Sequence, residues 1–180
     1  RARVRSAWAK FRELAPVLTS RGASLKVKGK VYKACVQRVM VYGSETWPMR
    51  SEDMQRLERA ERMMVRWMCG VSLKNRISSK ELNDRLGVVC VTEVVRQGRL
   101  RWFGHLERKG KDEWVSACRN VFVEGERGRG RGRKTWEECV KQDLKLYGLT
   151  KEDAMDRDAW RGIVGSCPTR ASMEQRTLNR

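Results

Sequence analysis

The chain has 180 residues, which suffices for one ordinary domain or two small ones. Forty lysines and arginines stand against 22 aspartates and glutamates, so the formal net charge is +18. A surplus of this size favours a polyanionic partner, with nucleic acid the first candidate and an anionic membrane surface the second. The sequence contains neither an apolar run of membrane-spanning length nor a signal-peptide pattern, and we therefore expect an intracellular protein that does not enter a membrane.

The residues that usually carry chemistry are sparse and scattered. The six cysteines include no Cys-x-x-Cys pair and the sequence has a single histidine, so we expect no zinc site, no other metal and no cofactor. A catalytic triad and a Gly-x-x-x-x-Gly-Lys phosphate loop are also missing from the sequence. Asp143 lies on the apolar side of its predicted helix, but one carboxylate cannot hold a metal for phosphoryl transfer. We therefore expect no catalytic residues.

Apolar residues recur at helical spacing through the first half of the chain. The pattern predicts helices over residues 1–18, 24–42 and 51–69. Ser24 is the expected N-cap of the second helix, and Gly43 and Gly70 are the expected stop signals. The predicted buried stripe of the third helix consists of Leu57, Ala60, Met64, Trp67 and Met68. The first residues already follow a helical pattern without a cap or a methionine, which suggests a piece of a longer protein.

Capping signals divide the second half of the chain into further helices. The expected helix starts are Ser78 with Glu81, Thr92, Asp112, Thr135 with Glu138, and Thr150 with Asp153. Gly87 and Gly148 are the expected stops of two of these helices. No stretch shows the period-two alternation of a strand. We therefore predict an all-α fold, an irregular multi-helix bundle that forms either one unit or two small helical subdomains.

Residues 98–108 bring together cations, aromatic rings and the histidine. At helical spacing, Val95, Trp102 and Leu106 form an apolar stripe, while Arg99, Arg101 and Arg108 fall on its flanks. One interpretation is an amphipathic core helix with a solvated basic face. The other is a helix that also contacts nucleic acid.

Residues 125–134 alternate glycine with arginine and end on Lys134. The glycines disfavour a helix and the cations repel one another, so we predict a mobile basic loop. Glycine lets a backbone follow a phosphate chain closely, which favours nucleic-acid binding over the alternative, a solvated flexible linker. Residues 165–180 are polar and aperiodic, and we expect a disordered tail.

Short motifs spread over most of the chain carry a resemblance to a known family. In chain order they are Val41-Tyr42-Gly43-Ser44-Glu45-Thr46-Trp47, Arg99-Leu100-Arg101-Trp102-Phe103-Gly104-His105, Gly132-Arg133-Lys134-Thr135-Trp136, Asp143-Leu144 with Gly148-Leu149, and Ala154 with Asp156-Arg157 and Trp160-Arg161. Together they resemble the C-terminal part of LINE-type (non-LTR) retrotransposon reverse transcriptases of the RTE-like group. The resemblance runs from about residue 11 to 164. One departure is Gly132, where the family often has proline.

The resemblance implies a division of the chain. Residues 1–50 would be a thumb-like helical segment at the end of the polymerase, and residues 51–124 a post-thumb helical region. The basic loop 125–134, a helical pair over 135–164 and the tail would follow. The catalytic palm would lie upstream in the same polyprotein, so this chain would not itself be an enzyme. Its implied partners are template RNA, the RNA–DNA hybrid and that palm, in a nuclear and cytoplasmic ribonucleoprotein.

The candidate contacts to nucleic acid are cations in three groups along the sequence. They are Lys26, Lys28, Lys30, Lys33, Arg99, Arg101, Arg108, Lys109, Arg127, Arg129, Arg131, Arg133 and Lys134. Two alternatives to the reverse-transcriptase fragment stay open. The chain is either a freestanding helical DNA- or RNA-binding protein derived from a retroelement, or a decayed fragment without function.

Overall fold

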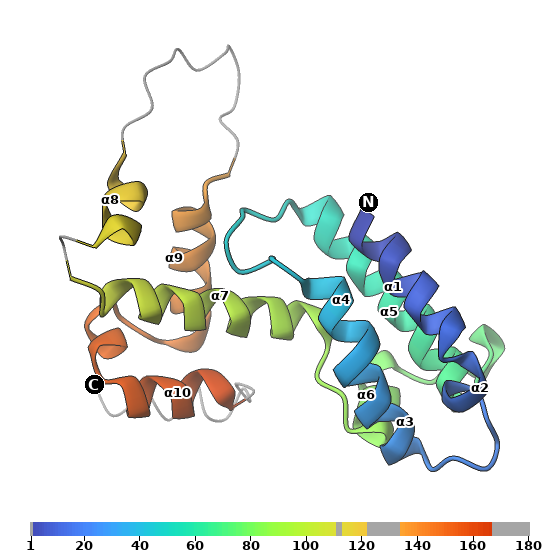
Figure 1. Ribbon diagram of the computed structural model, residues 1–180. Coiled ribbons are helices and arrows are strands. Elements are labelled where there is room, and N and C mark those ends of the chain that lie inside the picture. Colours follow the sequence, from blue (N-terminus) through green and yellow to red (C-terminus); the bar gives the residue numbers. More distant parts are fainter. Residues whose placement is uncertain (1, 111–112, 122–133, 167–180) are drawn as a thin grey trace. The chain divides into compact units, whose positions relative to one another are not determined.

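A computed structural model describes residues 2–110, 113–121 and 134–166 of the chain (Figure 1). These residues form helices joined by turns and include no strand, which confirms the all-α prediction. The expected basic loop, apart from Lys134, and the expected tail from residue 167 onward lie outside the described residues. In the described part of the chain, none of the helices combines the length and apolar character that a membrane span requires.

The helices gather into two compact units. Unit 1 comprises Arg1–Ser44 and Met49–Val95, and unit 2 comprises Glu45–Pro48 and Arg96–Arg180. Helix α7 (Val91–Glu107) contributes its first residues to unit 1 and the rest to unit 2. The division therefore does not follow the expected boundary at residue 50, because the helix after that boundary packs with the helices before it.

Unit 1 contains a layered set of helices around one apolar core. Its elements are α1 (Ala2–Glu13), α2 (Ala15–Leu18), α3 (Leu25–Val31), the π-helical turn η1 (Tyr32–Gln37), α4 (Arg38–Val41), α5 (Ser51–Cys69), the 3-10 turn η2 (Leu73–Asn75) and α6 (Ser79–Leu86). Phe11, Tyr32, Met64 and Leu82 are fully buried between them. This core fixes which faces of the helices remain for binding.

Local signals set most helix ends in unit 1. The hydroxyl of Ser24 accepts a hydrogen bond from the backbone N–H of Val27, and the hydroxyl of Ser78 accepts one from Glu81. Gly70 and Gly87 adopt left-handed backbone conformations after α5 and α6, as the stop signals predict. The expected helix over 1–18 is instead divided into α1 and α2, because Pro16 has no N–H to continue the α1 hydrogen-bond ladder.

The predicted helix over 24–42 is present but contains an unexpected wide turn. The segments α3, η1 and α4 follow one another without a break, and η1 has π-helical hydrogen bonding. In such a turn, residues five apart lie above one another, whereas the spacing in an α-helix is three or four. Lys33 and Arg38 therefore share a face across η1.

A buried carboxylate, and not the expected Thr92 cap, marks the start of α7. The helix begins at Val91, whose N–H donates to Oε2 of Glu61 on α5 at 2.7 Å. The other carboxylate oxygen of Glu61 accepts hydrogen bonds from Nε2 of Gln37 at 3.1 Å and from the hydroxyl of Tyr32 at 3.4 Å. Burial of this carboxyl raises its pKa to about 7, although these hydrogen bonds pull the pKa down.

Unit 2 contains the second part of α7 and several shorter helices. They are α8 (Trp114–Asn120), α9 (Trp136–Tyr147), the 3-10 turn η3 (Glu152–Met155) and α10 (Arg157–Gly165). The core contains Leu100, Phe103, Val140, Tyr147 and Trp160. Figure 1 shows α10 lying along α7, which is where Trp160 enters the core.

The cap predictions in unit 2 are confirmed in one place and corrected in another. Thr135 and Glu138 form a reciprocal capping box at the start of α9. Thr150 and Asp153 do bond to each other, but they close the turn that leads into η3, which contains Asp153. The last helix, α10, begins after Asp156, whose carboxylate accepts from two backbone N–H groups at its start. Asp112, the expected start of α8, lies outside the described residues, and Glu113 occupies the N-cap.

The tryptophans do not all serve as core residues. Trp160 is 1% exposed, whereas Trp67 is 57% exposed, so Trp67 does not belong to the buried stripe that the spacing of α5 predicts. Its ring packs edge to face on Trp8, with the ring centroids 5.8 Å apart. Trp102 is half-buried, and Phe103 takes the core position beside it. The spacing of apolar residues identifies an apolar stripe on a helix. Which side of that stripe is buried depends on the element that packs against it.

Candidate nucleic-acid interface

The structure places two of the candidate cations in the interior. Lys28 is buried, and its ammonium donates a hydrogen bond to the backbone carbonyl of Met68 at 3.0 Å. Met68 lies in the last turn of α5, where carbonyls lack helical partners and the helix dipole attracts a cation. The assignment of Lys28 to a phosphate contact is therefore corrected, since its charge stabilises the end of α5.

Arg99 is the second buried candidate. Its Nε lies 2.6 Å from Oδ2 of Asp143, and both side chains are less than a tenth exposed. Nε of Arg96 lies 4.0 Å from the other carboxylate oxygen. Arg99 thus does not sit on a flank of α7, as predicted, but joins α7 to α9 inside unit 2. Asp143 is buried as expected, and its partner is an arginine.

The remaining lysines of the first group form an exposed cationic stripe. Lys26, Lys30 and Lys33 occupy one face of α3 and η1, and Arg38 continues this face because of the π-helical turn. All four side chains are exposed. None of them makes an ion pair with a carboxylate among the residues that the structure describes. We call these four residues the α3–α4 stripe.

The other candidate cations differ in their exposure and in whether their charged groups have partners within the protein. Arg101 is exposed, whereas Arg108 is half-buried and donates from Nη1 to the carbonyl of Ala154 at 2.6 Å. Lys109 forms an ion pair with Glu113 at 2.7 Å. Lys134 is exposed and its ammonium bonds to the side-chain oxygen of Gln142. The remaining candidates lie outside the described residues, and they are Arg127, Arg129, Arg131 and Arg133.

Helix α7 buries a different face from the predicted one in unit 2. Val95 and Leu106 are buried as expected, but the core contacts between them come from Leu100 and Phe103. Gly104 lies directly against the indole of Trp160, where a Cβ would be 2.3 Å from Nε1. The indole nitrogen donates to the carbonyl of Leu100 at 3.1 Å. This contact between α7 and α10 is structural, so the core-helix interpretation holds for much of residues 98–108.

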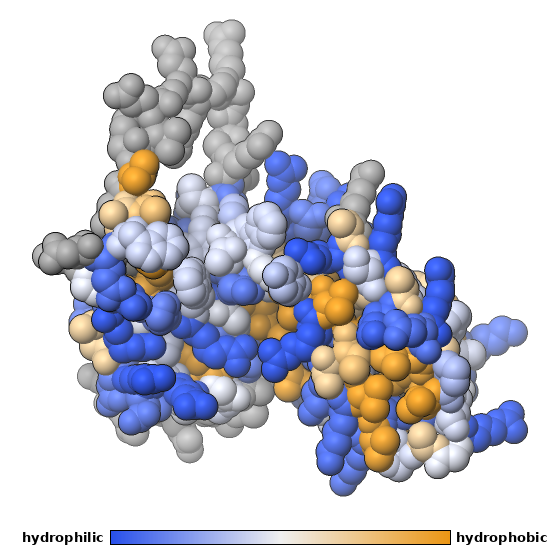
Figure 2. All heavy atoms as spheres, viewed as in Figure 1, coloured by the Kyte–Doolittle hydropathy of each residue, from blue (hydrophilic) through white to orange (hydrophobic). Residues whose placement is uncertain are grey.

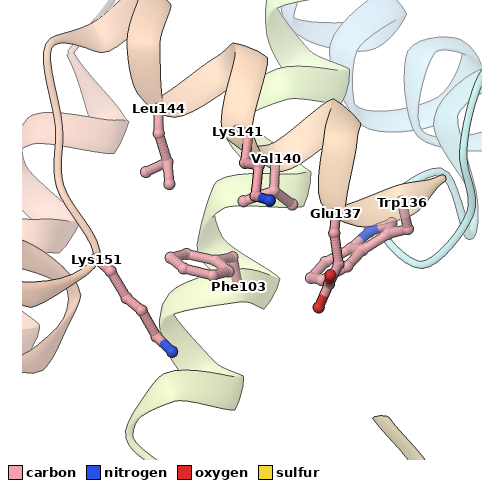
Figure 3. A pocket seen from close by; sticks show the side chains of 7 residues that line it. All are labelled: Phe103, Trp136, Glu137, Val140, Lys141, Leu144 and Lys151. Atoms are coloured by element: carbon pink, nitrogen blue, oxygen red, sulfur yellow. The ribbon is translucent and has the colours of Figure 1, made fainter. Parts of the chain in front are cut away.

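Unit 2 also contains a small pocket that the sequence did not predict. It has a volume of about 270 Å³ and lies along α9 (Figure 3). Its lining is mainly aromatic and aliphatic, with charged groups at the edge. The lining residues are Phe103, Trp136, Glu137, Val140, Lys141, Leu144 and Lys151. Only the order of Trp136, Val140 and Leu144 along one helix face hints at it in the sequence.

Arg38 and Tyr42 were also missed by reasoning from the sequence. Arg38 follows Lys33 by five residues, a spacing that would place it on a different face of an α-helix. The π-helical turn η1 brings the two residues to the same face, and no pattern in the sequence indicates this turn. Tyr42 is 68% exposed, and the guanidinium carbon of Arg3 lies 4.4 Å from its ring centroid. Figure 2 shows hydrophilic side chains projecting from the helices around smaller hydrophobic areas. Exposed cations and exposed rings thus occur together on unit 1.

Comparison with known proteins found no match: no protein-family model, no curated protein and no solved structure resembles this chain closely enough to count. Within the described ranges, no group of three or more histidine, cysteine, aspartate or glutamate side chains is arranged to hold a metal ion. The function is therefore inferred from the residues and their geometry.

Proposed function

We propose that this chain binds nucleic acid through the phosphate backbone, as the C-terminal part of a LINE-type reverse transcriptase. The observation that carries the proposal is the α3–α4 stripe, Lys26, Lys30, Lys33 and Arg38, which is exposed and has no carboxylate partner among the described residues. The net charge of +18 and the ordered motifs of the sequence support it.

The stripe suits a phosphate backbone better than a single small anion. From Lys26 to Lys33 the α-helical rise gives about 10 Å along the axis, a length over which a nucleic acid presents several charges. Lysine ammonium groups on flexible stems act as point charges and read no base sequence. An A-form-like duplex offers a shallow minor groove and phosphates, so the template RNA or its hybrid with DNA is the proposed ligand.

In this proposal the chain grips nucleic acid while an upstream palm catalyses. The buried carboxylates described above have structural partners: Asp143 pairs with Arg99, and Glu61 caps α7. We therefore propose that the chain alone has no polymerase or nuclease activity. Primer extension above background by the purified chain, with magnesium or manganese and nucleotides, would falsify this part of the proposal.

Equilibrium binding at two salt concentrations tests the proposed function. Single-stranded RNA, duplex DNA and an RNA–DNA hybrid of equal length are the ligands. We expect submillimolar binding that weakens steeply as salt rises, because each neutralised phosphate releases counterions. We expect little dependence on base sequence in the hybrid. Absence of binding to all three ligands at low salt would contradict the proposal.

A further inference from the structure

We propose that the α9 pocket of unit 2 binds one unpaired nucleobase of a single-stranded nucleic acid, with the adjoining phosphate at Lys141. This inference rests on the proposed function and adds a site to it. The pocket is formed by residues of α7, α9 and the segment after α9. Stacking of a base there would supply affinity that does not come from charge.

The aromatic wall of the pocket is held in place before any ligand arrives. The indole N–H of Trp136 donates to the carbonyl of Glu45 at 2.8 Å, which fixes the orientation of the ring. The ring centroid of Phe103 lies 6.5 Å from that of Trp136, and the two planes are tilted by 44°. Phe103 is itself anchored in the core against Trp160. A fixed aromatic wall lowers the ordering cost of binding a flat ring.

The size of the pocket suits a single ring system. Its volume of about 270 Å³ is just below the range of about 300–1,000 Å³ that is typical of sites for drug-sized ligands. Val140 and Leu144 on α9 complete an apolar floor beside the rings, as Figure 3 shows. A nucleobase has an apolar face for such a floor, and stacking on an aromatic side chain tolerates every base.

The charged residues at the edge of the pocket indicate that the base lies inside the pocket and the phosphate outside it. Lys141 is exposed and makes no ion pair with a described residue, so its ammonium is available to a phosphate. Lys151 is already paired with Glu107 at 3.1 Å. The lining by Phe103, Trp136, Val140 and Leu144 is apolar, which disfavours an anion inside the pocket. A neutral ring inside and a phosphate outside satisfy both conditions.

Two RNAs with the same backbone charge test this site. One is a 12-nucleotide single strand, and the other is an abasic strand of the same length. Stacking of one base is worth about 1–3 kcal/mol, which predicts that the base-bearing strand binds about 5- to 150-fold more tightly. Trp136→Leu should remove most of this preference. Trp114→Leu is the matched control, because Trp114 is an exposed tryptophan of the same unit outside the pocket.

A second pair of variants tests the phosphate contact. Lys141→Ala should weaken binding of the 12-nucleotide strand more than Lys145→Ala, which removes the same charge one turn further along α9. Photocrosslinking of the unaltered chain to a strand that contains 4-thiouridine tests the base site without any substitution. It therefore applies even if the Trp136→Leu variant does not fold. We expect crosslinks in the peptide that contains Trp136 and Lys141.

The outcomes separate this inference from the proposed function. Equal affinity for the base-bearing and abasic strands, or crosslinks confined to peptides that contain neither Phe103 nor any of residues 134–151, would overturn the base site and leave phosphate binding intact. Equal losses from Trp136→Leu and Trp114→Leu would also overturn it. Absence of binding to both strands would overturn the base site together with the proposed function.

Discussion

Arg99 and Asp143 form a buried ion pair, with 2.6 Å between Nε of the guanidinium and Oδ2 of the carboxylate. Arg99 belongs to α7 and Asp143 to α9, and 44 residues of sequence separate them. A buried charge is tolerated only when it is paired and hydrogen-bonded. The pair therefore ties α7 to α9, and Arg99 serves the fold of unit 2 and not a ligand.

Removal of one partner of this pair should destabilise the protein strongly. Arg99→Leu leaves the Asp143 carboxylate buried with Arg96, 4.0 Å away, as its remaining cation. We expect a loss of about 3–5 kcal/mol in the free energy of unfolding, measured by urea denaturation. The control is Arg101→Leu on the exposed side of α7, with an expected change within about 0.5 kcal/mol. Equal losses from the two variants would show that the pair does not stabilise unit 2.

Replacement of two glycines of α7 by alanine should change the stability of the protein in opposite directions. At Gly104 a Cβ would lie 2.3 Å from Nε1 of the buried Trp160 indole, so Gly104→Ala should cost about 1–3 kcal/mol through overpacking. At Gly98 nothing lies within 4 Å of the added Cβ, so Gly98→Ala should stabilise the helix by about 0.5–1 kcal/mol. Thermal melting of both variants checks this. A stabilised Gly104→Ala variant would exclude the close packing of α7 on Trp160.

The stability of unit 1 should depend on pH through Glu61. Burial raises the pKa of this carboxyl from its usual 4.5 to about 7. Between these values the folded protein holds a proton that the unfolded chain has released, so stability falls as pH rises through this window. At 1.36 kcal/mol for each pKa unit, the contribution across the window is about 3 kcal/mol.

Glu61→Gln isolates this contribution. The amide oxygen of glutamine still accepts a hydrogen bond from the N–H of Val91 but carries no charge. The unfolding free energy of the variant minus that of the parent chain should therefore grow by about 2–3 kcal/mol from pH 5 to pH 8. Urea denaturation at each pH gives both values. A difference that stays constant with pH would mean that Glu61 does not titrate in this range.

Features set by neighbours in the sequence could be predicted from it. The caps at Ser24, Ser78 and Thr135 and the stops at Gly70 and Gly87 follow from hydrogen bonds and backbone angles within one helical turn. The buried position of Asp143 also follows from helical spacing. These signals need no knowledge of the tertiary structure.

Features set by distant partners could not be predicted. The start of α7 depends on Glu61, which is 30 residues away from Val91, and Lys28 is buried because it meets the end of α5. The turn η1 has no signature in the sequence, yet it places Arg38 on the face of Lys33. The α9 pocket likewise needs Phe103 from another helix. Candidate cations could be counted in the sequence, but only the packing separates the exposed ones from the buried ones.

The salt dependence of binding to an RNA–DNA hybrid tests the central proposal most directly. Each phosphate contact contributes about 0.7–0.9 to the slope of log affinity against log salt. If Lys26, Lys30 and Lys33 each contact a phosphate, replacing all three with serine should flatten the slope by about two to three units. The control removes three exposed charges elsewhere in unit 1, through Lys74→Ser, Arg76→Asn and Lys80→Ser. Asparagine suits position 76, where φ is 49°.

We expect the Lys26, Lys30 and Lys33 variant to lose both affinity and salt slope, and the control to keep most of both. Melting temperatures of both variants should stay close to that of the parent chain, because all six side chains are exposed. If the two variants have the same salt slope, or if the Lys26, Lys30 and Lys33 variant keeps the slope of the parent chain, the α3–α4 stripe does not bind the phosphate backbone. The proposed function would then lose its main structural support.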